Sequence, residues 1–234
     1  GRGGGLGSWG EALSGKVSGM GVGLRADRDV GPMKVGATLT SGNYLAGSIM
    51  ARYMAEQPDA RVKLEVANTS AIVERVLGFD LDVGLIEGEI NHPDLDLLPW
   101  RDDELVVFCA PDHPLAAKKT LDDHDLRAAT WIVREPGSGT RQTFERAMHG
   151  LLPSLNLLLE LEHTEAIKRA VETGLGISCL SRVSLREAFR RGSLVPLAVP
   201  ERDFSRQFYF VLHRQKHRSP GVERWLQLCR ESSG

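Results

Sequence analysis

The sequence contains few of the residues that build disulfide frameworks, metal centres or membrane spans. Its three cysteines, Cys109, Cys179 and Cys229, are far apart and odd in number, and its seven histidines form no His-Glu-x-x-His pattern, so we predict no metal and no cofactor. No apolar run approaches the roughly 18 residues that span a bilayer, and no secretory signal is recognisable. Cys109 and Cys179 lie in apolar, strand-like runs and are predicted to be buried thiols, which a reducing compartment permits. These absences favour a globular cytoplasmic protein that makes no contact with a membrane.

An excess of positive charge is also missing. The chain carries 29 Lys and Arg against 31 Asp and Glu, a formal net charge of −2, so we do not expect it to bind nucleic acid by itself. The basic tract 213–218 is interpreted as a solvated turn, with contact to nucleic acid or to a partner as the alternative. The sequence has no Gly-x-Ser-x-Gly elbow and no credible catalytic triad. It therefore indicates a protein that is not an enzyme and has no catalytic residues.

What the chain does contain is a repeated pattern. Ser41-Gly42 is followed by Thr69 at the start of a Thr-x-Ala-Ile-x-x-x-Val pattern, and Ser138-Gly139 is followed at nearly the same spacing by Thr164 in the same pattern. A strand pattern precedes each Ser-Gly pair and a helix pattern follows it. The repeat predicts two half-domains of one plan that face each other across a cleft. Helix starts offer unpaired N–H groups and a favourable dipole, so the cleft is expected to bind a small anion.

Strand and helix patterns alternate from Met33 onward, which predicts an α/β protein with mainly parallel sheets. Two long apolar runs, at 104–110 and 207–212, are expected to cross between the lobes and form a hinge. The first subdomain is predicted at 33–110 together with 207–234, and the second at 111–206. Further strands are predicted at 33–39, 61–67, 82–86, 94–98, 131–134, 157–161 and 177–180, and helices at 42–57, 70–77, 140–149, 165–173, 183–190 and 220–229.

Residues 1–32 differ from the rest because they hold 11 of the 25 glycines and show no sustained period. We interpret them as a flexible leader, an expression remnant, or a linker to an upstream segment.

The segment 134–141 is the sharpest local signal for ligand binding. Gly139 permits close backbone approach, Ser138 and Thr140 add hydroxyl groups at a helix start, and Arg141 carries a planar fork that suits oxyanions. Replacement of Arg141 by Ala is expected to weaken oxyanion binding by about tenfold or more. The alternative is a plain helix cap with a surface arginine. The segment does not indicate a kinase-type phosphate loop, because no Gly-Lys-Ser/Thr closes it.

The first half offers a counterpart at 38–44. Thr40 or Ser41 is predicted to cap the helix that begins at Gly42, leaving N–H groups for a ligand, with capping alone as the alternative. Thr69 and Thr164 are expected at equivalent helix starts in the two lobes. A further pair, Glu87 and Glu135, follows predicted strands at the cleft rim. Each glutamate could orient Arg141 or bind a ligand amine, or could be a solvated loop acid.

Five motifs in order resemble one known family. KVGATLTSGNYLAG, DLDVGLIEGEINHPDL, LVVFCAPDHPLA, WIVREPGSGTRQTFE and AVETGLGISCLS together resemble the effector-binding domain of LysR-type transcriptional regulators over about residues 33–230. The Thr-Ser-Gly-Asn-Tyr and Gly-Ser-Gly-Thr-Arg versions look like the CysL- and CbbR-like branch, which regulates sulfur or carbon assimilation.

The resemblance implies two Rossmann-like subdomains of the kind found in type 2 periplasmic binding proteins, with an effector between them. It also implies a homodimer or homotetramer that binds promoter DNA through a winged helix-turn-helix, which this chain is not expected to contain. The helix at 42–57 carries two apolar stripes, one of which is predicted to serve the dimer. The residues that match the family's cleft positions are Thr40, Ser41, Gly42, Thr69, Glu135, Ser138, Gly139, Thr140 and Thr164, with Arg141 added on chemical grounds.

Two other functions remain as alternatives: a solute-binding protein for a transporter of small oxyanions, and an enzyme on the same fold. The lack of a signal peptide and of a disulfide speaks against the first alternative, and the lack of a nucleophile speaks against the second. Sulfate, sulfite, a phosphorylated sugar and a sulfur amino-acid precursor all fit as effectors.

Overall fold

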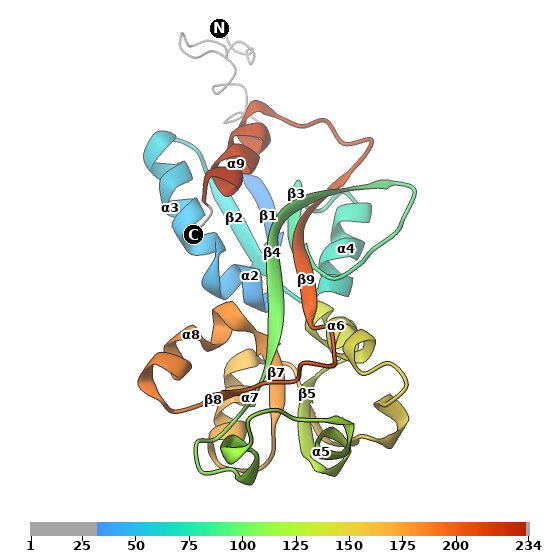
Figure 1. The fold of residues 1–234 in the computed structure, drawn as a ribbon. Helices are drawn as coiled ribbons and strands as arrows, with labels where there is room; N and C mark the ends of the chain where they lie inside the picture. Colours follow the sequence, from blue (N-terminus) through green and yellow to red (C-terminus); the bar gives the residue numbers. More distant parts are fainter. Residues whose placement is uncertain (1–31, 233–234) are drawn as a thin grey trace, which may run out of the picture.

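The computed structural model describes residues 32–232 and arranges them as two lobes joined by two long strands (Figure 1). The predicted leader lies almost wholly outside the described residues. Each lobe is a sheet with helices packed on it, so the predicted α/β fold of two subdomains is confirmed. Within residues 32–232 no helix is long and apolar enough to cross a bilayer.

The first lobe is built on a sheet in the order β2-β1-β3-β9-β4. Its first three strands are parallel, and β9 is antiparallel to both of its neighbours. Every residue of β3 is buried, as expected of a parallel strand that is covered on both faces. The strands are β1 (Met33–Ala37), β2 (Val62–Val66), β3 (Val83–Glu87), β4 (Leu95–Cys109) and β9 (Ser205–His213).

Helices cover both faces of this sheet. On one face α3 and α9 lie side by side, and their Ile49 and Trp225 are buried in the same apolar cluster. On the other face Ile72 and Val76 of α4 pack against Val211 of β9. These spacings of three and four residues place the apolar side chains on one side of each helix. The helices are α2 (Leu39–Tyr44), α3 (Ala46–Glu56), α4 (Thr69–Leu77) and α9 (Pro220–Glu231).

The single helix predicted at 42–57 is wrong in its start and its continuity. The chain turns into α2 already at Leu39 and breaks at Leu45 before α3 begins. The cap is Thr38, whose hydroxyl accepts from the N–H of Ser41 while the Ser41 hydroxyl accepts from the N–H of Thr38. This reciprocal capping box fixes the helix start. Thr40 and Ser41 therefore lie in the first turn and do not cap the helix.

The second lobe repeats the plan. Strands β5 and β6 pair in parallel, and a bridge between Trp131 and Ile177 brings them beside β7. Trp131 and Phe144 fill the centre of its core, with their ring centroids 5.2 Å apart. The strands are β5 (Thr130–Arg134), β6 (Asn156–Leu161), β7 (Ser178–Ser181) and β8 (Val195–Leu197), and the helices are α5 (Asp123–Ala128), α6 (Gly139–Ala147), α7 (Thr164–Glu172) and α8 (Arg182–Arg191), with 3-10 turns at Pro114–Ala117 and Leu152–Ser154. Neither α5 nor β8 follows from the sequence patterns, because they have only 6 and 3 residues.

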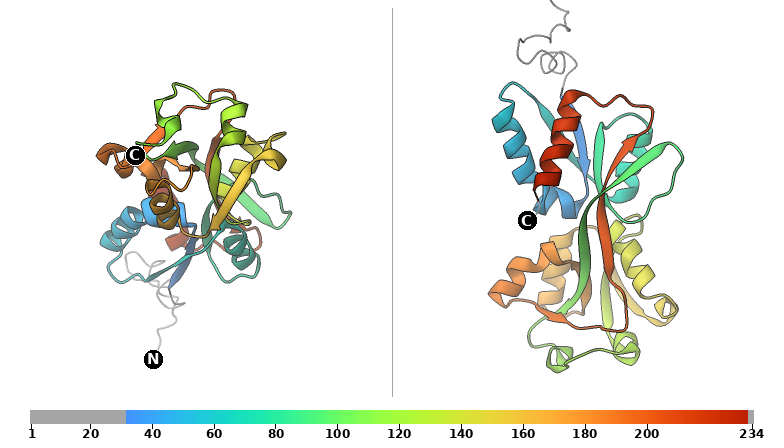
Figure 2. Two further views of the ribbon diagram at one scale, coloured as in Figure 1. Left: turned by 90° about the horizontal axis from the view of Figure 1, so that it is seen from below. Right: turned by 45° about the horizontal axis from the view of Figure 1, so that its top comes forward.

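The two lobes are joined by β4 and β9, which run side by side from one to the other (Figure 2). The predicted strands 94–98 and 104–110 are one strand of 15 residues. Residues 95–104 of β4 pair with β9, whereas Leu105–Phe108 pair with β7. The chain thus joins the sheet of the second lobe from Leu105 onward, several residues before the boundary expected near 110. On these pairings we propose that the lobes divide near 104 in β4 and near 205 in β9.

All three cysteines are buried and unbridged. Burial raises the pKa of the Cys109 thiol to about 11 and that of Cys179 to about 12, which keeps them protonated and unreactive. The prediction of buried thiols at these two positions is confirmed.

Candidate functional site

The second Ser-Gly segment begins α6, whereas the first lies within α2 after its start at Leu39. Ser138 caps α6 by accepting a hydrogen bond of 3.1 Å from the N–H of Arg141. A methyl group on Gly139 would lie only 2.3 Å from the carbonyl oxygen of Glu87, at the end of β3 in the other lobe. The α6 start therefore touches the first lobe directly. Thr69 of the first lobe also binds Glu87, so two predicted cleft residues, Thr69 and Gly139, meet from opposite lobes at this strand end.

In the first lobe, the hydroxyl groups of Ser41 and Thr69, which are predicted to bind a ligand, are bound by acceptors of their own lobe. Glu87 is only 2% exposed, and its carboxylate accepts from the Thr38 hydroxyl at 2.7 Å. The Thr69 hydroxyl donates at 3.1 Å to the Glu87 carbonyl and lies 3.4 Å from its carboxylate. The Ser41 hydroxyl donates to the carbonyl of Leu85 at 3.0 Å. Glu87 thus neither contacts Arg141 nor lies in a solvated loop.

In the second lobe, the polar groups at the start of α7 are less completely paired by hydrogen bonds. Thr164 is 2% exposed, and its hydroxyl is buried without a hydrogen-bond partner among the described residues. Its helix, α7, has His163 at the cap position, where the side chain makes no capping hydrogen bond. Buried polar groups are almost always paired. The unpaired Thr164 hydroxyl and the uncapped helix start therefore leave hydrogen-bonding capacity for a guest.

The lobes are closed on each other in this conformation. The N–H of Ser70 donates to the carbonyl of Gly137 at 3.1 Å, and the Asn68 amide donates to Glu135 at 3.1 Å. On one side of these contacts, the amide of Gln142 exchanges two hydrogen bonds with the backbone of Glu89. Closure explains why the predicted cleft residues have so little exposed surface.

A further inter-lobe contact joins Tyr44 of α2 to Glu165 of α7. The Tyr44 hydroxyl donates to the carboxylate, and Lys168 forms an ion pair with the same carboxylate at 2.9 Å. Burial and the hydrogen bond to Glu165 raise the pKa of Tyr44, so the phenol remains a donor. Burial also raises the pKa of Glu165, but Tyr44 and Lys168 lower it by more, so the carboxylate is ionised.

Glu135 is held in a similar way. Burial raises its pKa, but the hydrogen bonds and charge of Arg134 together with the Asn68 amide lower it below its ordinary value. Its carboxylate therefore links Arg134 of its own lobe to Asn68 of the other.

Arg141 does not face the first lobe through its side chain. Its guanidinium donates to Glu145 at 2.7 Å, to Glu160 at 2.9 Å and to the carbonyl of Arg134 at 2.8 Å. All three partners belong to the second lobe, and two of them are acidic. The charge of Arg141 is therefore neutralised within its own lobe.

Sequence reasoning missed a charged cluster on the crossing strands. Arg206 of β9 and Asp103 of β4 are opposite partners in the strand pairing, and their side chains form an ion pair at 2.7 Å. Both side chains are almost fully buried. Arg206 also donates to Thr140 at 3.1 Å, and Asp103 accepts from Ser181 at 2.8 Å. The only sequence signal was the charge that flanks the two apolar runs chosen as crossing strands.

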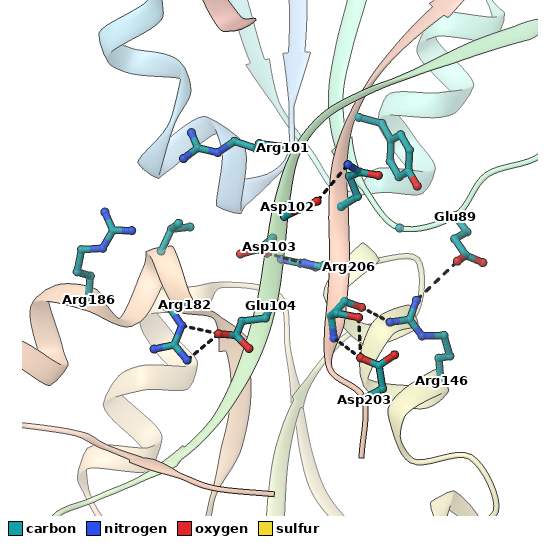
Figure 3. Close-up of a pocket in the computed structure, with 15 residues that line it drawn as sticks. Glu89, Arg101, Asp102, Asp103, Glu104, Arg146, Arg182, Arg186, Asp203 and Arg206 are labelled. Atoms are coloured by element: carbon teal, nitrogen blue, oxygen red, sulfur yellow. Dashed lines mark hydrogen bonds and ion pairs between the residues drawn. The ribbon is translucent and has the colours of Figure 1, made fainter. Parts of the chain in front are cut away.

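A cavity of about 930 Å³ surrounds these strands (Figure 3). Arginines and acids line it in a balanced set, several of them in ion pairs. A smaller cavity of about 400 Å³ lies between α2, α7 and α8. Neither cavity is lined by the predicted effector residues. Among the described residues there is no group of His, Cys, Asp or Glu side chains that could hold a metal ion.

Two α/β lobes, two crossing strands and converging helix starts define a ligand-binding domain of the periplasmic-binding-protein type. The chain belongs to the LysR substrate binding domain family, whose model matches residues 26–234. It is therefore the effector-binding domain of a LysR-type regulator.

The relatives agree with this assignment. An uncharacterized HTH-type transcriptional regulator, YeiE of Escherichia coli (strain K12), is 41% identical over 202 residues, which are 86% of this chain and 68% of the relative. The HTH-type transcriptional regulator CysL of Bacillus subtilis (strain 168) is 33% identical over 67% of this chain and 52% of its own length. The regulatory domain of Synechocystis PCC6803 CcmR, solved in complex with 2-PG, is 28% identical over 86% of this chain and 96% of its own, with a TM-score of 0.79.

Proposed function

We propose that this domain senses a small anionic metabolite held between its lobes and thereby controls transcription through a winged helix-turn-helix of the whole regulator. The proposed binding set draws hydroxyl groups and helix starts from both lobes, and two charged residues from the second lobe. Its members are Thr40, Ser41, Gly42, Thr69, Glu135, Ser138, Gly139, Thr140, Arg141 and Thr164. Arg141 belongs to the set through its place in the first turn of α6, because its guanidinium is bound within its own lobe. On this proposal the domain works in the cytoplasm, acts without a metal or cofactor, and is not an enzyme.

The observation that carries the proposal is the unused hydrogen-bonding capacity at the start of α7. The buried Thr164 hydroxyl has no partner among the described residues, and the helix start above it lacks a side-chain cap. An oxyanion would accept from both the hydroxyl and the N–H groups, and the helix dipole would favour its charge. The CcmR domain supports the anionic class, since the ligand in its complex, 2-phosphoglycolate, is a phosphorylated carboxylate.

We propose that closure of the two lobes on the ligand is the conformational change that signals binding. A ligand between the lobes gains contacts from both sides only when they are closed, so it shifts the balance toward that state by its difference in affinity. Hydrogen bonds between the lobes, such as Asn68 to Glu135 and Tyr44 to Glu165, would further stabilise the closed state.

A thermal-shift series tests the proposal. Sulfate, sulfite, phosphate and 2-phosphoglycolate are compared with neutral sugars at matched ionic strength. A specific anion should raise the melting temperature in proportion to the logarithm of its concentration, because ligand binding stabilises the folded state. Replacement of Thr164 by Val should reduce that rise without lowering the melting temperature of the unliganded protein. If no anion produces more than the matched salt, the anionic class is wrong.

We further propose that the domain forms a homodimer or a homotetramer. Large apolar side chains are exposed on both lobes: Met54 and Val66 on the first, Leu158 and Leu159 on the second. Apolar patches of this kind commonly mark association surfaces. Light scattering of the wild type and of Leu158→Glu checks this, and a wild-type monomer at high concentration would contradict it.

A further inference from the structure

The hinge holds a buried arginine whose donors are not all used. The Arg206 side chain is 1% exposed. Its Nε donates to Asp103 at 2.7 Å and its Nη1 donates to Thr140 at 3.1 Å, whereas Nη2 is buried without a hydrogen-bond partner among the described residues. A guanidinium remains charged at all relevant pH values and carries five N–H donors. Leaving such a donor unpaired away from water costs free energy, which an acceptor at Nη2 would recover.

The position of Arg206 links the hinge to the second lobe's helix starts. Arg206 and Asp103 lie opposite each other on the crossing strands (Figure 3). Thr140, which accepts from Arg206, stands in the first turn of α6 after β5. Ser181, which donates to Asp103, is the cap of α8 after β7. The cluster therefore lies where the carboxyl ends of the second lobe's strands meet the hinge, the place where open α/β sheets bind ligands.

The other arginines near the hinge differ from Arg206 in their partners. Arg182 forms an exposed ion pair with Glu104 at 2.8 Å, and Arg146 lies 3.7 Å from Glu89 and donates to the carbonyl of Ser205. Arg206 has one carboxylate, and that carboxylate also accepts from Ser181. Of these side chains, Arg206 is the buried one that retains an unpaired charged donor.

We propose that Arg206 is the charge-recognising residue of the inter-lobe site, with Nη2 donating to a carboxylate, sulfur oxyanion or phosphoryl oxygen of the effector. The inference rests on the proposed function and assigns it a residue that lies outside the predicted set. Because Arg206 stands on β9 and is bound to β4, an anion on Nη2 is coupled to both strands that set the angle between the lobes. Thr140, already bound to Nη1, lies beside the same anion.

Calorimetry on the full 234-residue chain tests this with sulfate, sulfite, phosphate and 2-phosphoglycolate. Arg206→Lys keeps the charge but loses the fork. Asp103→Asn combined with Arg206→Gln replaces the ion pair by a neutral hydrogen-bonded pair, so no buried carboxylate is left unpaired. The control is Arg182→Gln, which removes an exposed arginine from the same cavity. We expect Arg206→Lys to weaken binding of the best anion by at least about tenfold, the double variant to abolish it, and the control to stay within about twofold.

The outcomes separate the inference from the function on which it rests. If the double variant folds, as judged by its melting curve, and binds the anion within about twofold of wild type, the assignment of Arg206 is wrong. If, in addition, Thr164→Val loses anion binding, the anion binds between the lobes but does not contact Arg206. If the wild type binds none of the four anions, both the anionic class and the role of Arg206 are overturned. Should Arg206→Lys fail to fold, the double variant alone decides.

Discussion

The two lobes share one backbone plan but differ in how the polar groups at their helix starts are used. In the first lobe, the helix starts surround Glu87, a buried carboxylate bound by Thr38 and Thr69. In the second, the Thr164 hydroxyl has no partner among the described residues, and Thr140 at the start of α6 accepts from Arg206 of the crossing strand β9. Helix starts favour negative charge in both cases. The first lobe satisfies this preference with its own side chain, and the second leaves it to a ligand.

Arg141 and Arg206 also differ in whether their charged donors are paired within the protein. Arg141 adjoins the Gly-Ser-Gly segment and has the sequence context of an anion contact, but Glu145 and Glu160 neutralise it. Arg206 lies about 65 positions further along the chain and has no motif around it, yet it keeps a buried donor unpaired. Proximity in sequence to a ligand motif is therefore a weaker guide than the balance of charges that the fold assembles.

The largest expected effect comes from making the lobes clash. In Gly139→Ala the new methyl group would lie 2.3 Å from the Glu87 carbonyl oxygen. Overpacking of this kind costs about 1–3 kcal/mol, so anion affinity should fall by roughly 10- to 100-fold. Each lobe should keep its own packing, because the clash exists only across the cleft. Calorimetry and small-angle scattering check the result.

The matched control for that variant is Gly47→Ala in α3, where the added methyl group meets no atom within 4 Å. It should leave the affinity unchanged and stabilise the helix by about 0.5–1 kcal/mol. Equal affinity of Gly139→Ala and wild type would show that the ligand binds with the lobes apart.

A second test removes the charge of the first lobe. Glu87→Gln keeps an acceptor for the Thr38 hydroxyl but takes a negative charge out of the cleft. Anion affinity should rise by roughly three- to tenfold, since like charges in a poorly solvated site repel. Glu89→Gln, an exposed neighbour in sequence with 76% of its side chain accessible, is the control and should have little effect. An unchanged affinity in Glu87→Gln would place the anion far from the first lobe's helix starts.

A third test weakens closure without touching the anion. Tyr44→Phe removes the hydroxyl that donates to Glu165 across the lobes. A partly exposed hydrogen bond contributes about 1 kcal/mol, so affinity at pH 7 should fall by about fivefold. A double-mutant cycle with Glu165→Gln should show that the two losses are not additive.

The same contact predicts a pH dependence. The pKa of Glu165 lies below its ordinary value of 4.5 when the lobes are closed. Its contribution to closure is therefore complete above pH 4.5 and is lost as the pH falls through the lowered pKa. The difference between wild type and Tyr44→Phe should shrink over that range. A difference that persists in the protonated state would assign the effect of Tyr44 to packing alone.

The smallest effect is expected for Arg141→Ala. Because its guanidinium is engaged by two acids and a backbone carbonyl of its own lobe, loss of the side chain should change anion affinity by less than about threefold. It should lower the melting temperature instead, as a half-buried ion-pair network is removed. A tenfold loss of affinity at unchanged melting temperature would restore the direct contact that the sequence motif suggests.

The sequence predicts most of this fold because the spacing of apolar residues within each segment indicates whether it is a strand or a helix. Strands such as β3 are short apolar runs, and α4 shows Ile72 and Val76 at helical spacing. The sequence predicts the helix start at Gly42 because Ser41-Gly42 looks like a cap, whereas the true cap is Thr38. The choice between Thr38 and Ser41 depends on a reciprocal pair of hydrogen bonds. The hinge was placed on the correct strands, although β4 enters the second sheet earlier than its apolar run suggests.

The candidate site was only partly visible. Helix starts at Ser138 and Thr164 follow from the repeat, but the engagement of Thr69 by Glu87 joins residues 18 positions apart, and the contact of Arg206 with Thr140 joins residues 66 positions apart. No local pattern encodes such pairs, because they depend on where separate strands end.

The amino-acid order alone determined the alternation of strands and helices, the internal repeat and the family, since each is made of short local patterns that can be recognised without knowing which segments meet in space. Only the tertiary structure decided which charged and polar groups of the cleft are paired within the protein and which keep an unpaired donor. The reason is that desolvation and pairing act between side chains brought together by the sheets, and a buried charge is defined by its neighbours in space.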